Sequence, residues 1–308
     1  MKRVPFCGFL FLCLSLASGS NIAGMAARPR LVKDCRVEIN GREYAWDDIG
    51  RFVLAGDTLW LAIHGEEEHS GWVASAGELT EVGGRTFWVA PPEPGLYPLI
   101  ASVGSTVKTV NVFVMVPATE LRDGCINGFR IGKYERTPPF PNFDKPRGFI
   151  ELTEENAGTK VSPRYKLGDF APKLQSGFPK YMILREELLV KLELLSDLVR
   201  SKGYTCERLS VLSGYRTPAG HRSGASSAHC YGGAADVYID CNNDGHLDDL
   251  NRDGESSSKD SRILAGYVDE LEALHPELVG GCGWYRRTSS RGPFIHTDVR
   301  GERTRWHR

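Results

Sequence analysis

Two features that would place this chain in a broad class are missing: an excess of charge of one sign and an apolar run long enough to cross a membrane. Its 308 residues contain 38 Lys and Arg against 39 Asp and Glu, a formal net charge of -1. This balance argues against a nucleic-acid partner or an anionic membrane surface as partner. The apolar run at 4–17 is too short to span a bilayer, so no membrane span is expected. The oligomeric state is left open.

The N-terminus has the pattern of a secretory signal peptide. Met1-Lys2-Arg3 is a basic start, the apolar run follows it, and the small residues Ala17 and Gly19 suit cleavage near Gly19. A cut at Ser20 or later stays open. We therefore expect a signal peptide at 1–19 and an exported protein, either periplasmic or extracellular.

Six cysteines lie beyond this segment, which allows up to three disulfides in an oxidising compartment. The sequence does not fix their pairing. Cys230 follows His229 directly, so a thiolate metal ligand is conceivable there, but a structural disulfide is the favoured interpretation. The six are Cys35, Cys125, Cys206, Cys230, Cys241 and Cys282.

The segment 30–117 has the pattern of an all-β module. Short alternating runs at 58–63, 85–89 and 109–116 are separated by Gly, Pro, Asn and Asp. We interpret it as an immunoglobulin-like β-sandwich in which one face of the last run is buried. Trp60, Trp72 and Trp88 are interpreted as core side chains rather than a ligand-binding platform. The Gly- and Pro-rich segment 118–160 is predicted to be a connector.

The remainder, 161–308, alternates between helical and strand patterns. Apolar residues at helical spacing predict a helix over 184–202, ending at Gly203. A second helix is expected over 261–274, with Asp260 or Ser261 as its N-cap. Strands are expected at 209–212, 234–239, 280–285 and 293–299.

His229, Asp236 and His296 are the candidate zinc ligands. Imidazole nitrogen and carboxylate oxygen are good Zn²⁺ ligands, and three protein ligands plus water is typical of catalytic sites. On a helix, the step from His229 to Asp236 would separate them by about 10.5 Å along the axis, too far to share one ion. A loop that turns at Gly232 and Gly233 and enters a strand suits the pair better.

Four motifs occur in one order: Ser213-Gly214-Tyr215-Arg216, then Ser227-x-His229 with six residues before Asp236, then Gly283-Trp284-Tyr285, then His296-x-Asp298. Together they resemble the zinc D-alanyl-D-alanine carboxypeptidase and murein endopeptidase family, which groups with lysostaphin-type peptidases and the hedgehog domain. The resemblance covers about 162–308. It implies an α+β hedgehog/D-Ala-D-Ala-peptidase-like domain over 161–308, with the N-terminal sandwich unexplained.

The resemblance also implies roles for individual residues. His229, Asp236 and His296 would hold Zn²⁺, Arg216 would bind a substrate carboxylate or stabilise the oxyanion, and Ser227 would support the site. The implied substrates are D-alanine-containing stem peptides or cross-links of peptidoglycan.

One position departs from the family pattern. Many members have a Glu base shortly before the last ligand, and here Phe294 stands two residues before it. Two roles for Asp298 are therefore open: the general base, or a partner that orients a ligand imidazole.

An acidic stretch follows the expected strand at once and has calcium-loop spacing. A first copy starts at Asp240, and a second starts at Asp249 and reaches Asp260. Calcium binding and a solvated acidic loop are both open, since neither copy has the bidentate Glu at position 12. The candidate ligands are Asp240, Asn242, Asp244, His246, Asp248, Asn251 and Asp253.

These observations predict an exported zinc peptidase that hydrolyses D-alanine-containing bonds of peptidoglycan, as a carboxypeptidase or as a cross-link endopeptidase. A catalytically inactive, zinc-containing cell-wall-binding protein is the main alternative, because the base is in question. A peptidase acting on proteins is a further one.

Overall fold

The chain is β-rich, with an α+β arrangement in its C-terminal half. The computed structural model describes 35–65, 70–135, 137–222 and 224–308. The expected signal peptide lies outside these residues. Residues 34–308 belong to one compact unit.

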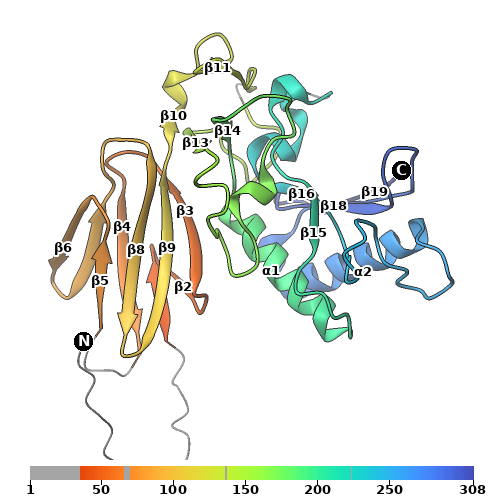
Figure 1. The fold of residues 1–308 in the computed structure, drawn as a ribbon, viewed down its shortest axis with the longest axis horizontal. Helices are drawn as coiled ribbons and strands as arrows, with labels where there is room; N and C mark the ends of the chain where they lie inside the picture. The colour runs from red at the N-terminus through yellow and green to blue at the C-terminus, as the bar shows by residue number, and fades with distance from the viewer. Residues whose placement is uncertain (1–34, 66–69, 136, 223) are drawn as a thin grey trace, which may run out of the picture. The chain divides into compact units, whose positions relative to one another are not determined.

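The first part is built from two antiparallel-rich sheets (Figure 1). One is five-stranded in the order β2-β1-β4-β7-β6, and the other is four-stranded in the order β3-β9-β8-β5. The first comprises β1 (Arg36–Ile39), β2 (Arg42–Tyr44), β4 (Thr58–His64), β6 (Glu78–Val82) and β7 (Arg85–Val89). The second comprises β3 (Asp48–Val53), β5 (Ser70–Ala74), β8 (Gly95–Val103) and β9 (Thr106–Val114).

One apolar core joins the two sheets, as expected for a sandwich. Leu59, Leu61 and Trp88 from the first sheet pack in one cluster with residues of the second, such as Leu99 and Val112. Burial of this alternating set is the main source of stability for the two sheets.

The prediction that all three tryptophans are core residues is wrong for Trp60. Trp88 is fully buried, and Trp72 packs against the core in part. Trp60 lies between Leu59 and Leu61, so its side chain points to the opposite, outer face of the sheet and is 50% exposed.

Strand β9 also differs from the expected half-buried strand, because residues from both of its faces are buried. Val110, Val112 and Val114 face the sandwich core, while Phe113 belongs to the core of the C-terminal part. The amide of Asn111 donates to the carbonyl of Lys160 at 2.9 Å on the same side. The sandwich and the C-terminal part therefore share buried surface.

The segment 118–160, predicted as a connector, contains short elements of its own, and others flank it. β10 (Val116–Pro117) and β14 (Lys180–Met182) flank β13 (Gly148–Leu152), and β11 (Cys125–Ile126) pairs with β12 (Phe129–Arg130). Single 3-10 turns η1 (Ala118–Glu120) and η2 (Leu167–Phe170) lie in the same region.

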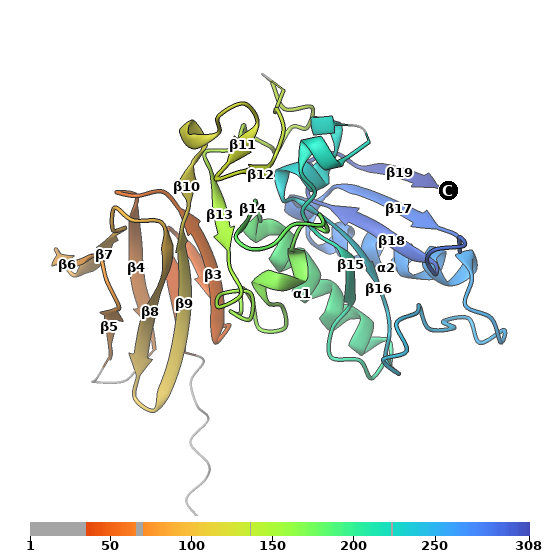
Figure 2. The ribbon, with the colours of Figure 1, turned by 45° about the horizontal axis from the view of Figure 1, so that its top comes forward.

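The C-terminal part contains a five-stranded sheet in the order β15-β16-β18-β17-β19, with two α-helices beside it (Figure 2). The helices are α1 (Glu186–Ser201) and α2 (Ser258–Leu274), which confirm both expected helices. Val237 and Ile295 point from the sheet into the core that α1 and α2 complete. The strands are β15 (Ser210–Ser213), β16 (Ala234–Tyr238), β17 (Gly281–Tyr285), β18 (Phe294–Asp298) and β19 (Thr304–His307).

The expected N-cap of α2, Asp260 or Ser261, is wrong, because the helix begins about one turn earlier. Ser257 is the N-cap, and Asp260 at the third helical position accepts a hydrogen bond from its backbone nitrogen at 2.7 Å, which forms a capping box. The sequence Ser256-Ser257-Ser258 offers several caps, and only the turn geometry selects one.

Among the described residues, no helix is long and apolar enough to cross a membrane.

Candidate metal centre

Strand register brings two of the expected ligands together. Asp236 on β16 lies directly opposite His296 on β18. Because side chains alternate along a strand, both point to the face opposite Val237 and Ile295, away from the helices. A carboxylate and an imidazole thus share one side of the sheet.

His229 reaches the same point from a short connection. It lies on the 3-10 turn η5 (Ala228–Tyr231), which ends at Gly232 with a left-handed φ of 68°. A side chain on Gly232 would meet the carbonyl of Ile183. This turn lets the chain enter β16 immediately, which confirms the expected loop running into a strand.

Three ligand atoms converge at the centre of this face. His229 Nε2 lies 3.1 Å from His296 Nδ1 and 3.2 Å from Asp236 Oδ1, and His296 Nδ1 lies 3.3 Å from the same oxygen. All three side chains are buried. Ligands about 2.0–2.1 Å from a tetrahedral ion are about 3.3–3.4 Å apart, so the triad has the spacing of a metal site.

In each imidazole, the nitrogen that points away from the centre makes a hydrogen bond, and this bond determines the tautomer. His229 Nδ1 donates to the carbonyl of Gly214 at 2.7 Å, and His296 Nε2 donates to Asp298 Oδ2 at 2.8 Å. In a neutral imidazole the other nitrogen is then an acceptor. Two nitrogen lone pairs and a carboxylate oxygen therefore face one another, an arrangement that a bound cation stabilises. The triad fits a metal ion by donor chemistry as well as by spacing.

The charges around the triad keep its carboxylate ionised. Burial alone would raise the pKa of Asp236, but its hydrogen bonds with His229 and His296, and the positive charge that these imidazoles carry when protonated, hold that pKa well below its ordinary value. Burial lowers the pKa of His229. The deprotonated forms of both groups are the forms that bind a metal.

Asp298 supports the centre from behind His296. Its buried carboxylate also accepts hydrogen bonds from the backbone nitrogen of Gly281 at 2.7 Å and from Arg300 Nε and Nη2. Burial would raise its pKa, but His296 and Arg300 lower it. Every oxygen thus has protein donors, which suits orientation of His296 rather than proton transfer from a water.

The other two expected site residues lie at the edge of the triad. Arg216 follows β15; its Nε donates to Ser213 Oγ at 2.9 Å, and its Nη2 forms an ion pair with Asp236 Oδ2. Ser227 immediately precedes η5 and lines the cleft. Arg216 therefore contacts one ligand directly, and Ser227 does not.

A cleft of about 440 Å³ opens over the triad. Trp306 forms part of its wall: it packs over Gly283, where a side chain would meet its indole, and lies 5.2 Å from the His296 ring. The motif search missed most of the lining residues. The motifs include Tyr285 but not Phe140, His221, Arg222, Arg291, Arg300, Trp306 or Arg308.

The lining is strongly basic, and local sequence patterns indicate only part of this. Arginine is frequent in the tail 300–308, but no sequence pattern places this tail beside Arg291 or Arg222. His221 is partly buried, and burial followed by the charge of Arg216 lowers its pKa.

The expectation that Cys230 forms a structural disulfide is wrong. Cys206 pairs with Cys241, and Cys125, Cys230 and Cys282 are unpaired. Cys230 is neither in a disulfide nor a member of the triad; its buried thiol donates to the carbonyl of Gly224 at 3.3 Å. Burial raises its pKa to about 12, so it stays a thiol at neutral pH.

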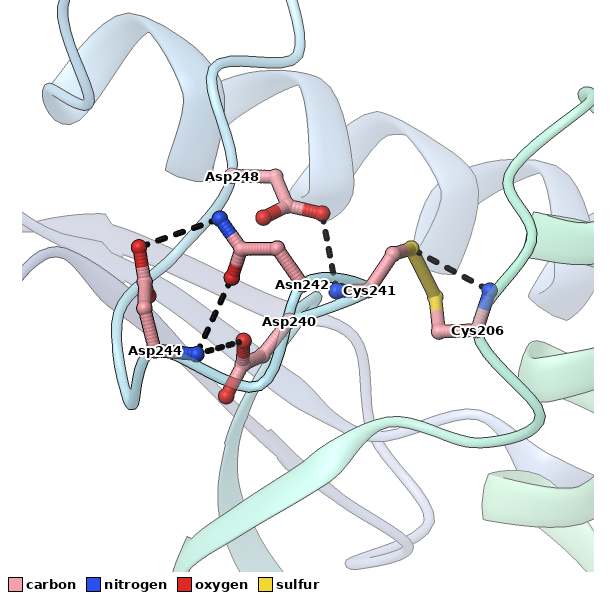
Figure 3. The surroundings of a disulfide bond; sticks show 6 residues. All are labelled: Cys206, Asp240, Cys241, Asn242, Asp244 and Asp248. Atoms are coloured by element: carbon pink, nitrogen blue, oxygen red, sulfur yellow. Dashed lines mark hydrogen bonds between the residues drawn. A yellow bond between two sulfur atoms is a disulfide. The ribbon is translucent and has the colours of Figure 1, made fainter.

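The acidic loop 240–260 begins beside that disulfide (Figure 3). Asp240 accepts from the backbone nitrogens of Asp244 and Gly245 at 3.0 and 3.1 Å, and Asp248 accepts from that of Cys241 at 2.9 Å. Asn242 Oδ1 also accepts from the nitrogen of Asp244 at 3.0 Å.

The second copy repeats this pattern nine residues on. Asp249 accepts from the nitrogens of Asp253 and Gly254 at 3.2 and 2.7 Å, and Asn251 accepts from that of Asp253 at 2.8 Å. Asp260 instead accepts from Leu250, Asn251 and Ser257, so the structure uses it to fasten the loop to α2. Calcium binding by this loop stays a prediction, and so does a role for His246.

No family model matches this chain, and no curated protein matches it. Among solved structures, the adhesin InvE of Yersinia pseudotuberculosis is similar over 28% of this chain and 28% of its own, at 13% identity and a TM-score of 0.20. That likeness is too weak to support an argument about fold or function.

Proposed function

We propose that this chain is an exported zinc peptidase that hydrolyses D-alanine-containing peptide bonds of bacterial peptidoglycan. The observation that carries the proposal is the convergence of His229 Nε2, Asp236 Oδ1 and His296 Nδ1, three acceptors within 3.1–3.3 Å of one another. These residues belong to the ordered motifs that resemble the zinc D-alanyl-D-alanine carboxypeptidase and murein endopeptidase family. The hedgehog/D-Ala-D-Ala-peptidase-like and immunoglobulin-like assignments of the two parts belong to this proposal.

These three residues would hold Zn²⁺, which supplies a water of lowered pKa and polarises the scissile carbonyl. The surrounding residues prepare that chemistry. Asp298 holds His296 in the tautomer that directs Nδ1 inward, and the carbonyl of Gly214 does the same for His229.

Arg216 is the proposed substrate-binding residue. Its guanidinium lies between the cleft and the outer oxygen of Asp236, and its Nε is fixed by Ser213. A guanidinium fixed in this way can donate to a substrate carboxylate or to an oxyanion that develops beside the triad.

The charge of the cleft supports an anionic peptide as substrate. Asp236 is the only carboxylate side chain among the described lining residues, against five guanidinium groups, of which Arg216 pairs with Asp236 and Arg300 with Asp298. A stem peptide carries free carboxylates, so this field would concentrate and orient it. The guanidinium groups belong to Arg216, Arg222, Arg291, Arg300 and Arg308.

His221 is the proposed proton acceptor. Among the described residues that line the cleft, it is the only imidazole or carboxylate outside the triad. Asp298 is fully buried and already accepts from His296 and Arg300, which leaves it the orienting role.

The same observation favours a second candidate function: a zinc-containing protein that binds cell wall without cutting it. The cleft offers no carboxylate base among the described residues, and His221 would have to replace one. Zinc content and binding to sacculi, with no cleavage, would establish that function.

Digestion of purified peptidoglycan sacculi tests the proposal. Wild type should release new muropeptides detectable by mass spectrometry: loss of D-alanine marks a carboxypeptidase, and severed cross-links mark an endopeptidase. His229→Ala should release none. His275→Ala is the matched control, because this part-exposed imidazole pairs with Glu277 and does not line the cleft, so digestion should be unchanged. A zinc-loaded wild type that releases nothing would refute the peptidase.

Two parts of the proposal lie away from the cleft. The Cys206–Cys241 disulfide agrees with an exported protein in an oxidising compartment. Ca²⁺ is a proposed second ion, held by the acidic loop that follows β16 and braced against α2 by Asp260.

A further inference from the structure

The outer face of the sheet β2-β1-β4-β7-β6 carries a hollow of about 600 Å³ beside Trp60. This volume is within the range of about 300–1,000 Å³ that is usual for small-molecule sites. The hollow is lined by Glu38, Asn40, Gly41, Thr58, Trp60, Leu61, Ala62 and Arg85.

The alternation of β4 explains the hollow. Trp60 and Ala62 are successive outward positions, and Ala62 pairs with Glu38 of the neighbouring strand. The methyl group of Ala62 leaves space beside a large indole. A bulky residue there would fill it.

The indole is held in place rather than mobile. Phe87 on β7 lies opposite Trp60 and meets it edge to face, with ring centroids 5.1 Å apart and planes at 72°. The guanidinium of Arg85 lies 5.5 Å from the indole centroid. Asn40 Oδ1 accepts from the backbone nitrogen of Trp60 at 2.8 Å, which leaves the amide group of Asn40 as a donor.

The chemistry of the lining selects a neutral, hydroxyl-rich ligand. Glu38 contributes a carboxylate, one oxygen of which pairs with His64 Nε2 at 2.8 Å, and Arg85 contributes a guanidinium, so the lining residues carry one charge of each sign. Thr58 adds a hydroxyl. Acceptors and donors therefore border an apolar aromatic surface. A saccharide ring has the matching surface, with hydroxyls at its rim and an apolar face of C–H groups.

A peptide suits the hollow less well. β1, β4 and β7 each have paired neighbours on both sides, so their backbone groups are used within the sheet. An extended peptide could not add to these strands, and only side chains are available to it.

We propose that this hollow is a saccharide-binding site, with Trp60 as the stacking platform and Glu38, Asn40 and Arg85 as hydrogen-bonding groups. It lies on the sandwich, and none of its lining residues lines the cleft over the triad. The site would hold the chain on a glycan independently of peptide cleavage. The choice of an N-acetylglucosamine glycan as probe rests on the function proposed above; the saccharide site itself does not.

Isothermal titration calorimetry tests the site by measuring the affinity of the full chain for a β-1,4-linked N-acetylglucosamine tetrasaccharide. Wild type and His229→Ala should bind equally, since the triad takes no part. Trp60→Ala should weaken binding by about tenfold or more, as truncation of an aromatic anchor does. Ala62→Leu should weaken it comparably by filling the hollow while keeping the indole.

Val73→Ala is the matched control, because Val73 is 64% exposed on the other sheet and should leave affinity unchanged. Circular dichroism verifies that each variant is folded.

No binding by wild type, or equal binding by wild type, Trp60→Ala and Ala62→Leu, would overturn the proposal. Binding of a peptide instead of the tetrasaccharide, lost in Trp60→Ala, would overturn it in favour of a peptide site. Cleavage of a soluble stem peptide by Trp60→Ala at the wild-type rate would separate the two functions.

Discussion

Replacement of Asp298 by Asn tests how the metal centre is built. Asp298 accepts from His296 Nε2 at 2.8 Å and from the backbone nitrogen of Gly281 at 2.7 Å, and it forms an ion pair with Arg300. Asparagine has nearly the same shape but no charge. It can still accept one hydrogen bond, yet it no longer stabilises the charge that His296 shares with a bound ion.

The expected effect is on zinc affinity. Loss of a carboxylate that orients a ligand histidine typically weakens metal binding by about 10–100-fold. That range corresponds to about 1.4–2.7 kcal/mol of binding free energy. The effect should be this large here because Asp298 is fully buried and no water can replace its carboxylate.

The assay is competition for zinc between the protein and a chromophoric chelator. Glu193→Gln is the matched control: this buried carboxylate also pairs with an arginine, Arg164, but has no contact with a ligand histidine in the described structure. Both variants should lose stability, and only Asp298→Asn should lose zinc affinity. A zinc dissociation constant within twofold of wild type for Asp298→Asn, or an equal loss in Glu193→Gln, would refute the reasoning.

Four further predictions concern stability, catalysis and calcium. Lys191→Met removes a buried ammonium that pairs with Glu272 and donates to two backbone carbonyls. Because Arg305 still pairs with Glu272, the free energy of unfolding in urea should fall by about 1–3 kcal/mol. Lys202→Met, at a part-exposed pair, should cost under about 1 kcal/mol; equal losses would contradict this. Gly232→Ala should lower the unfolding midpoint because its φ is 68° and its side chain would meet a backbone carbonyl; an unchanged midpoint would count against that strain. Arg216→Lys should keep zinc but lower kcat/KM on a stem peptide by about 100-fold, and wild-type kinetics would exclude the proposed role. Calcium at about 100 times its Kd should stabilise the zinc-loaded protein by about 2.7 kcal/mol, and an unchanged melting temperature would contradict calcium binding by the acidic loop.

Local patterns predicted the secondary structure of the site well. The short, mostly apolar run at 234–239 predicts a strand, and Gly232 with Gly233 marks the turn before it, so β16 and the entry of His229 followed from neighbouring residues. The helix expected over 184–202 is α1 at Glu186–Ser201, because its apolar spacing is regular.

What depends on distant contacts was not predictable. Cys206 and Cys241 pair because β15 and β16 are neighbours in the sheet, a fact that no spacing of cysteines reveals. Arg291 and Arg308 reach the cleft from separate segments. The exposure of Trp60, in contrast, was predictable, because a residue between two inward-facing leucines of a strand points outward. The interpretation of Trp60 as a core residue relied on its residue type and did not use this alternation.

The most direct test of the central claim is the zinc content and zinc K-edge absorption of the purified, full-length protein. We predict about one zinc ion per chain, bound by two imidazole nitrogens at about 2.0–2.1 Å and by oxygen. The double variant His229→Ala/His296→Ala should retain none. A folded wild type that takes up no zinc, or a double variant that binds it fully, would contradict the account.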